Sequence, residues 1–257
     1  MIHNTAIIHP DAEIDNDVEI GPYSVIGNNV KIGAGTRIAS HVVINGPTKI
    51  GENNQFFQFS SIGDAPQDKK YSGDEESTLI MGNNNVIRES CTINRGTEAG
   101  GGVTRLGDDN WIMAYVHIAH DCIIGNQNVF ANHTTLAGHV HINNQVTLGG
   151  FTGVHQFCRI GDMSFTAISS VVVKDVPPYI IVSGNTAKPS GLNKVGLNRN
   201  GLEADSVEKI RQAYKTIYRE GLLLKDAIAS LETLAAESEQ VKNFVEFIRC
   251  SERGITR

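Results

Sequence analysis

The chain has 257 residues, a formal net charge of −6 and only 19% charged residues. This negative charge argues against nucleic acid as a general partner, because the phosphate backbone attracts basic surfaces. The first residues contain no basic segment followed by a long apolar run, and no apolar stretch reaches the length that spans a bilayer. We therefore expect a cytoplasmic protein without an integral membrane segment.

A six-residue repeat begins close to the N-terminus. Its first anchors are isoleucine, with one phenylalanine: Ile8, Ile14, Ile20, Ile26, Ile32, Ile38, Ile44, Ile50, Phe56 and Ile62. The residue two positions before each anchor is mostly small or β-branched, and residues two apart on an extended chain face the same side. Short strands alternating with bends at this period are typical of a parallel β-helix of hexapeptide repeats. An α-helix is excluded, because a period of six does not match 3.6 residues per turn.

Two insertions interrupt the repeat, a polar one at 63–78 and a glycine-rich one at 95–103. Long loops on a rigid scaffold often carry function, although a merely solvated loop is the alternative explanation. The segment D-V-P-P-Y (175–179) is expected to end the coils, because proline cannot donate to a parallel ladder. We expect a β-helix over 1–185 and a small α-helical C-terminal domain over 186–257.

The last fifty residues change their period from six to that of an α-helix. Apolar residues recur at helical spacing from Asp205 onward and predict three amphipathic helices, after an irregular stretch at 180–201. Asp205 or Ser206 is the expected N-cap of the first helix and Ser238 that of the last, while Gly221 is an expected stop.

Three of the cysteines fit the repeat. Cys91, Cys122 and Cys158 each lie two residues before an anchor, where the repeat favours a small buried side chain. No C-x-x-C pair is present. We therefore expect reduced cysteines that pack in the core rather than nucleophiles or metal ligands.

The repeat resembles that of known hexapeptide proteins, which implies three strands per coil, a triangular prism and left-handed winding. A coil of this kind contains 18 residues, so residues 18 apart lie above one another at the inter-strand distance of about 4.8 Å. His120, Gly138 and Gln156 would then form one column, with His155 in the column before it. Asp121 and His139 would form the column after it.

These columns lie on the same edge of the prism as the starts of both insertions, so Lys70 and Arg95 are expected to reach the same place. An imidazole, with an ordinary pKa of about 6.5, suits a general base near pH 7. Asp121 could orient His120, although adjacent residues of a strand face opposite ways and the pairing requires a bend. Zinc is the rival use of clustered histidines. Hexapeptide carbonic anhydrases carry an H-x4-H spacing that is absent here, and we expect no metal.

Several segments closely resemble the UDP-N-acetylglucosamine O-acyltransferase family. The resemblance runs along nearly the whole chain and is carried by S-H-V-V-I-N-G-P-T-K-I-G (40–51), Q-D-K-K-Y-S-G (67–73), I-R-E-S-C-T-I-N-R-G-T (87–97), H-I-A-H-D-C (117–122), L-A-G-H-V (136–140), V-H-Q-F-C (154–158) and D-V-P-P-Y (175–179). It implies transfer of an (R)-3-hydroxyacyl group from acyl carrier protein to the 3-hydroxyl of UDP-N-acetylglucosamine, the first step of lipid A biosynthesis. It also implies a homotrimer with active sites between neighbouring prisms.

The resemblance further implies roles for individual residues. His120 would be the general base, Asp121 its partner, and the backbone N–H of Gly138 the donor to the oxyanion. No cofactor is expected beyond the phosphopantetheine that the carrier protein brings. The residues implied in contacts with the substrates are Asp68, Lys70, His117, His139, His155, Gln156, Asn193 and Arg199.

Four positions bear on specificity. Many family members have His at Asn94, Glu at Val195 and a second Arg at Asn200, so nucleotide binding is expected to differ here. Ile168 occupies the position with which the family limits acyl length. A large residue there predicts an acyl donor of about ten to twelve carbons rather than fourteen.

Two other functions remain open from the sequence. The N-acyltransferase that acts later in the same pathway normally carries an extra domain before its repeat, whereas here the repeat begins by Ile8. A structural or ice-binding β-helix would show regular outward Thr-x-Thr arrays, and none runs along these coils.

Overall fold

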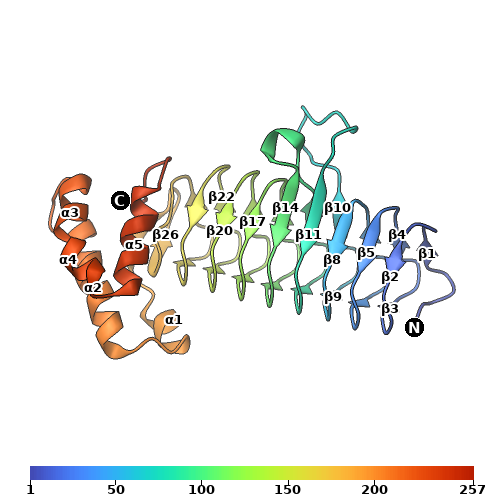
Figure 1. The fold of residues 1–257 in the computed structure, drawn as a ribbon, viewed down its shortest axis with the longest axis horizontal. Helices are drawn as coiled ribbons and strands as arrows, with labels where there is room; N and C mark the ends of the chain where they lie inside the picture. Colours follow the sequence, from blue (N-terminus) through green and yellow to red (C-terminus); the bar gives the residue numbers. More distant parts are fainter.

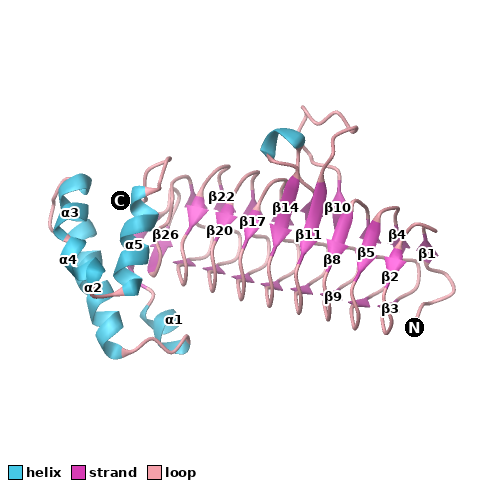
Figure 2. Cartoon of the chain, in the orientation of Figure 1, coloured by secondary structure: helices cyan, strands magenta, loops and turns pink.

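The computed structural model describes residues 1–257 and has the shape of a long prism with a helical cap at its C-terminal end (Figures 1 and 2). Each predicted hexapeptide contributes a short strand whose last or near-last residue is the buried anchor, as in β16 (His117–Ile118) and β19 (Thr135–Leu136). The anchors and the small residues before them fill the interior. Burial of these apolar side chains supplies the main driving force for the coil.

The strands form three sheets, one on each face of the prism. The first sheet contains β1 (Ile7–Ile8), β4 (Val25–Ile26), β7 (Val43–Ile44), β10 (Ser61–Asp64), β13 (Thr92–Asn94), β16, β19, β22 (Gly153–Val154) and β25 (Val171–Val172). The second contains β2 (Glu13–Ile14), β5 (Val30–Ile32), β8 (Thr48–Ile50), β11 (Thr78–Met81), β14 (Val103–Leu106), β17 (Ile123–Ile124), β20 (His141–Ile142) and β23 (Arg159–Ile160). The third contains β3 (Glu19–Ile20), β6 (Arg37–Ile38), β9 (Gln55–Phe56), β12 (Val86–Ile87), β15 (Trp111–Ile112), β18 (Val129–Phe130), β21 (Thr147–Leu148), β24 (Phe165–Thr166), β26 (Ile180–Ser183) and β27 (Lys188–Leu192).

The pairing register confirms the coil of 18 residues and the alignment across both insertions. Ile118 pairs with Leu136, and Leu136 with Val154, in parallel. On the other side Ile118 pairs with Ile93, and Ile93 with Ile62. Both insertions therefore leave the prism after strands of the first sheet, at the edge that follows it.

The corners of the coils turn through residues with left-handed backbone conformation. At the corners after the first sheet these include Asp121, His139 and Phe157, with φ of 60°, 61° and 65°. One such residue reverses the outward and inward alternation of a strand, so neighbouring side chains at a corner can approach each other. The bend that a His120–Asp121 pairing requires is therefore built into the coil.

The cysteines lie as predicted. Cys91, Cys122 and Cys158 are free and fully buried, whereas Cys250 is exposed. Burial raises the pKa of Cys91 to about 11 and that of Cys122 to about 12, which disfavours the nucleophilic thiolate.

The prediction that D-V-P-P-Y ends the coils was wrong. β26, which follows the two prolines, pairs in parallel with β24, and β27 then adds to β26 in antiparallel direction. Pro178 lies at a corner next to Gly161, where no ladder N–H is needed. The stretch 180–201 is likewise not irregular, since it holds both strands and the helix α1 (Lys194–Arg199).

The remaining helices cap the prism. They are α2 (Ala204–Tyr218), α3 (Leu224–Ser230), α4 (Glu232–Ala236) and α5 (Glu239–Arg249). The three predicted helical regions are present, with the middle one divided at Leu231. Ser238 is confirmed as an N-cap, but α2 begins after Glu203 without a side-chain cap and ends before Gly221. None of the helices combines the length and apolar character needed to cross a bilayer.

Candidate active site

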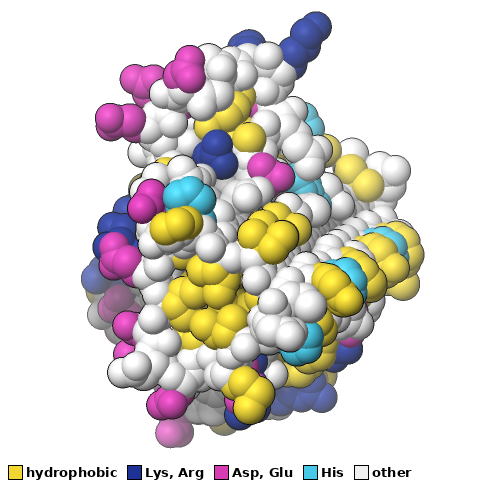
Figure 3. Space-filling model, turned by 90° about the vertical axis from the view of Figure 1, so that its right-hand side faces the viewer, with side chains coloured by type: hydrophobic (Ala, Val, Ile, Leu, Met, Phe, Trp, Pro, Cys, Tyr) yellow, Lys and Arg dark blue, Asp and Glu magenta, His cyan; other side chains and the backbone are white.

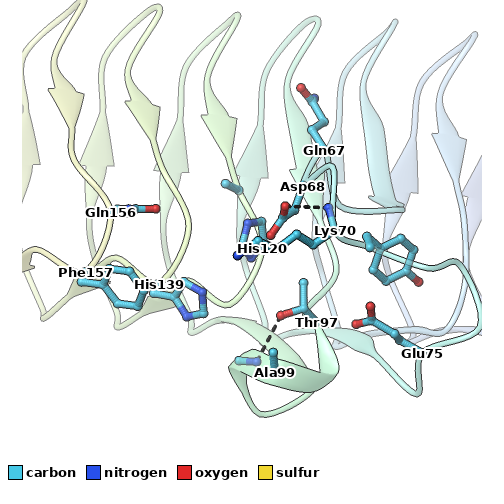
Figure 4. Close-up of a pocket in the computed structure, with 13 residues that line it drawn as sticks. Gln67, Asp68, Lys70, Glu75, Thr97, Ala99, His120, His139, Gln156 and Phe157 are labelled. Atoms are coloured by element: carbon cyan, nitrogen blue, oxygen red, sulfur yellow. Dashed lines mark hydrogen bonds between the residues drawn. The ribbon is translucent and has the colours of Figure 1, made fainter.

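A cavity of about 810 Å³ lies at the edge after the first sheet, under the two insertions (Figure 4). Corners of the coil supply one wall and the insertions supply the other. The residues that line it are Gln67, Asp68, Lys70, Tyr71, Glu75, Thr97, Ala99, Gly100, Ala119, His120, His139, Gln156 and Phe157. The predicted convergence of histidines and polar loops at one edge is therefore present in the structure.

His120 lies directly against Gly138 of the next coil. A β-carbon added to Gly138 would lie 2.6 Å from Cε1 and 2.8 Å from Nε2 of His120, so only glycine leaves room for the ring. The N–H of Gly138 makes no backbone hydrogen bond, unlike the flanking amides of Ala137 and His139, which donate to Val154 and His120. This N–H is therefore free to donate to a ligand beside the imidazole.

Asp121 is buried beneath the cavity and holds the other side of the ring. Its Oδ2 lies 2.7 Å from Nδ1 of His120, and its side chain is 1% exposed against 14% for His120. An ionised carboxylate can only accept hydrogen bonds, so Nδ1 is the donor and Nε2 keeps the lone pair of the neutral ring. The pair thus has the arrangement of a base and the group that orients it.

His139 completes the floor of the cavity. Its ring stacks on Phe157 with centroids 4.4 Å apart and meets the His120 ring edge-on at 5.3 Å. Its Nε2 lies 3.7 Å from Oδ2 of Asp121. Burial lowers the pKa of His139, so this second imidazole is mostly neutral near pH 7 and can donate or accept hydrogen bonds.

The two insertions hold each other. Oε2 of Glu75 accepts a hydrogen bond from the N–H of Glu98 at 2.8 Å, which joins the first insertion to the short helix η1 (Glu98–Gly100) of the second. Asp68 accepts from the N–H of Lys70 at 2.9 Å, and both side chains extend from their loop toward His120 (Figure 4).

Arg95 does not reach the cavity, contrary to expectation. Its guanidinium donates to the carbonyl of Gly63 at 3.0 Å and to the hydroxyl of Tyr71 at 3.0 Å. Both partners belong to the first insertion. The cation is therefore used to hold the base of that loop, and Lys70 is the cation of the cavity wall.

Besides Asp121 and Gly138, which lie against the ring of His120, five predicted site residues do not line this cavity. His117 lies on the flank of the first sheet with Nδ1 2.7 Å from the hydroxyl of Thr92, and burial lowers its pKa. The exposed His155 has Nδ1 3.2 Å from the carbonyl of Gln156. The remaining three residues lie later in the chain: Ile168 follows β24, Asn193 precedes α1 and Arg199 ends α1.

Asn193 and Ile168 have distinct surroundings. Asn193 caps α1, because its Oδ1 accepts from the N–H of Gly196 at 3.1 Å and its amide donates to the carbonyl of Met163 at 2.8 Å. Arg199 is in the last turn of that helix and exposed. Ile168 is 71% exposed at the corner after β24, on the edge that follows the third sheet. None of these three residues lines the cavity of this chain.

Sequence reasoning missed several lining residues, chiefly Thr97, Tyr71, Glu75 and Phe157. Phe157 could have been found, since it is 18 residues after His139 and therefore in the same column. The others lie on the insertions, where no repeat fixes the position.

The cavity also contains the cluster of side chains best suited to a metal. Ligand atoms of His120, Asp121 and His139 lie within 4.8 Å of one another. Both oxygens of Asp121 already accept hydrogen bonds, Oδ1 from Thr97 N–H and Oδ2 from the Thr97 hydroxyl and from His120. Three of the four acceptor positions of the carboxylate and Nδ1 of His120 are therefore already used in hydrogen bonds, which is the arrangement of a hydrogen-bonded pair.

Comparisons with known proteins agree with the motifs. Residues 175–256 match the family model described as Udp N-acetylglucosamine O-acyltransferase, Domain 2, and residues 103–138 match Bacterial transferase hexapeptide (six repeats). Residues 2–98 match the GMPPB C-terminal domain. The family models thus cover the helical cap and the coils up to residue 138.

Relatives match along the full length. The acyl-[acyl-carrier-protein]–UDP-N-acetylglucosamine O-acyltransferase of Thiobacillus denitrificans is 55% identical over 256 residues, which is 100% of this chain and 99% of that protein. The protein of the same name from Neisseria gonorrhoeae is 52% identical over 257 residues, with coverage of 100% and 99%.

Solved structures of the same enzyme family superpose closely on this chain. The UDP-N-acetylglucosamine acyltransferase of Francisella novicida superposes with a TM-score of 0.98 at 45% identity, covering 100% of this chain and 94% of that one. The O-acyltransferase of Moraxella catarrhalis superposes with a TM-score of 0.97 at 47% identity, covering 100% and 99%. The fold is therefore the left-handed parallel β-helix with a helical C-terminal cap. The chain is an acyltransferase and belongs to the UDP-N-acetylglucosamine O-acyltransferase family.

Proposed function

We propose that this enzyme transfers an (R)-3-hydroxyacyl group from acyl carrier protein to the 3-hydroxyl of UDP-N-acetylglucosamine, as the first, cytoplasmic step of lipid A biosynthesis. The observation that carries the proposal is the contact between His120 and Gly138 at the floor of the cavity, with Asp121 behind the imidazole. The names of the full-length relatives supply the substrates.

His120 acts as the general base in this reaction. Its Nε2 takes the proton of the sugar hydroxyl while the hydroxyl oxygen forms a bond to the thioester carbonyl carbon. Collapse of the tetrahedral intermediate breaks the carbon–sulfur bond, and the departing thiolate of the carrier takes the proton from the imidazolium. Asp121 stabilises the imidazolium between the two transfers, since it accepts from Nδ1 at 2.7 Å.

Gly138 contributes its backbone N–H to the intermediate. The amide makes no backbone hydrogen bond, and Gly138 itself lies against the imidazole of the base. A donor aimed at the developing oxyanion is typically worth ~3–4 kcal/mol of transition-state stabilisation. The scheme uses no metal and no other cofactor, and the acyl group arrives on the phosphopantetheine of the carrier protein.

The acceptor binds among the polar side chains of the cavity. Lys70 supplies a cation for a phosphate or sugar oxygen, and Asp68, His139 and Gln156 supply hydrogen-bonding groups. His117 and His155 extend this surface along the coils. The uridine diphosphate is contacted by Asn193 and Arg199 of a neighbouring subunit, and Val195 and Asn200 modify that end of the site.

We further propose a homotrimer with each site between two prisms. An aromatic ridge runs along the edge after the third sheet, where hydrophobic side chains alternate with histidines (Figure 3). The ridge consists of Tyr23, His41, Phe59, Tyr115, His133 and Phe151. Its four hydrophobic members are each 56–64% exposed, and exposed apolar side chains gathered along one edge favour association. Ile168 lies on the same edge.

The activity test uses purified enzyme, 3-hydroxyacyl carrier protein thioesters and UDP-N-acetylglucosamine. We expect acyl transfer to the sugar nucleotide and none to an acylated glucosamine acceptor, the substrate expected of the later N-acyltransferase. His120→Ala is expected to lower kcat by at least about 100-fold. Full activity in a folded His120→Ala enzyme would reject His120 as the base.

The assembly test combines mass measurement with complementation. Light scattering is expected to give three copies, and unfolded and refolded mixtures of inactive His120→Ala and Arg199→Ala subunits are expected to regain part of the activity. Recovery requires that one subunit supplies the base and its neighbour the arginine. A monomer with full activity would contradict the proposal.

A further inference from the structure

Thr97 contacts the buried carboxylate with both its backbone and its side chain. It lies in the second insertion, immediately before η1, and is only 6% exposed. Its N–H donates to Oδ1 of Asp121 at 2.8 Å, and its hydroxyl donates to Oδ2 at 2.7 Å. The same hydroxyl oxygen accepts from the N–H of Gly100 at 3.1 Å, which fixes the direction of its own proton.

Asp121 has few other means of orientation. Apart from Thr97, its carboxylate has His120 Nδ1 at 2.7 Å and the more distant Nε2 of His139 at 3.7 Å. Since the side chain is 1% exposed, bulk water does not supply further donors. Without the threonine hydroxyl, the only hydrogen bond to Oδ2 would come from the imidazole of His120. That imidazole is the group that the carboxylate has to orient.

The backbone of the insertion closes over the carboxylate. A β-carbon added to Gly100 would collide with the carboxyl group of Asp121, so the loop lies in direct contact with it. Glu75 of the first insertion holds this loop in turn through the N–H of Glu98. The contact is therefore part of a packed arrangement and not an isolated hydrogen bond.

We propose that Thr97 is a positioning residue for acyl transfer: it fixes the carboxylate of Asp121 so that the carboxylate can orient His120. The inference rests on the proposed function, in which His120 is the base. Thr97 touches no reacting atom in this scheme. Its effect is on the chemical step, because the pair must hold its geometry while the imidazole gains and loses a proton.

The experiment is a double-mutant cycle between Thr97→Val and Asp121→Ala in the full-length enzyme. Thr97→Val removes the hydroxyl and keeps the volume and the backbone N–H. We expect it to lower kcat about tenfold with KM for both substrates changed less than about twofold, because a hydrogen bond to a charged group is lost. In the Asp121→Ala background the same substitution is expected to change kcat by less than about twofold, since its partner is gone.

Two further variants separate positioning from loss of structure. Thr97→Ser keeps the hydroxyl and is expected to restore kcat to within about twofold of the wild type. Thr134→Val replaces another buried threonine, whose hydroxyl bonds to the carbonyl of Gly149, and is expected to leave kcat unchanged. Thermal unfolding of every variant reports the folded fraction.

The outcomes are distinct. Full kcat in Thr97→Val, an equal loss in both backgrounds, or no recovery in Thr97→Ser would each overturn the inference. If His120→Ala is inactive while Thr97→Val is fully active, the role of Thr97 fails and the proposed function stands. If His120→Ala is fully active, the proposed function itself fails.

Discussion

The imidazole of His120 lies against the α-carbon of Gly138, the residue one full coil later. A β-carbon at Gly138 would be 2.6 Å from the ring, closer than any real side-chain contact. The pairing register that joins Ile118 to Leu136 sets this proximity. The absence of a side chain at residue 138 is thus what lets the ring occupy the floor of the cavity.

Gly138→Ala is predicted to be a strong loss of function. The new methyl group displaces the imidazole from its hydrogen bond with Asp121 and from the free amide. A displacement of this size costs on the order of 100-fold in kcat. Steady-state rates with a saturating acyl donor measure the effect, and circular dichroism checks the fold.

Gly153→Ala is the matched control for this substitution. Gly153 is in β22 of the first sheet, next to the strand β19 that precedes Gly138, and a β-carbon there has nothing within 4 Å. We expect activity within about twofold of the wild type. Equal losses at the two glycines would mean that alanine disturbs the coil in general and not the ring of His120.

Arg95 and Tyr71 are predicted to act as one unit on substrate binding. The guanidinium donates to the tyrosine hydroxyl at 3.0 Å and to Gly63 at the base of the first insertion. Arg95→Gln and Tyr71→Phe should each raise KM for the sugar nucleotide about three- to tenfold with a small change in kcat, as expected when a loop that carries binding groups becomes less ordered.

The double variant checks this coupling. Because the two substitutions remove the same hydrogen bond, their effects on KM are expected to be less than additive. Additive effects, or a loss confined to kcat, would contradict a role in ordering the loop.

The coil could be predicted from the sequence because its determinants are local and repeated. Each hexapeptide needs one buried anchor, so the positions of Ile62, Ile93 and Ile118 were sufficient to align three coils across two insertions. β27 and α1 have no such repeat. β27 contains Pro189 and Gly191 and is a strand only because β26 offers it an edge, and α1 is short and contains Gly196.

The site likewise contains residues whose positions the repeat predicts and residues whose positions it does not predict. The column of His120 and Gly138 follows from counting residues along the coil, and Phe157 could have been added to the column of His139 by the same count. The conformation of the insertions depends on single hydrogen bonds that no period encodes. Arg95 therefore bonds to Tyr71 rather than reaching the cavity, and Thr97 lies on the carboxylate of Asp121.

The half-buried histidines are predicted to make the fold less stable in mild acid. Burial lowers the pKa of His117 and His141 in the folded chain, while an unfolded imidazole titrates near 6.5. Below about pH 6.5 the unfolded chain therefore binds more protons than the folded chain. The free energy of unfolding consequently falls as the pH decreases. Above that pH the stability is fully present.

Urea unfolding at pH 7.5 and pH 5.5, at one fixed protein concentration, measures this effect. His117→Gln cannot take up the proton and is expected to reduce the difference between the two pH values. Exposed His3→Gln is the control and is expected to leave the difference as in the wild type. A difference that does not respond to His117→Gln would assign the acid sensitivity to other groups.

Ile168 is predicted to set the length of the acyl chain. The side chain is 71% exposed on the edge after the third sheet, the edge that in the proposed trimer faces the cavity of a neighbour. We expect a large apolar residue there to block the far end of the acyl channel, so that the wild type prefers donors of about ten to twelve carbons. Ile168→Gly removes the block and is expected to shift the preference toward fourteen carbons by about tenfold in kcat/KM, because each extra methylene pair regains apolar contact.

The comparison requires acyl carrier protein thioesters of ten, twelve and fourteen carbons with both enzymes. Ile168→Val, which removes one methyl group, is expected to give an intermediate preference. A wild type that already favours the fourteen-carbon donor severalfold would show that Ile168 does not limit the chain. A glycine variant with an unchanged profile would place the end of the channel elsewhere on that edge.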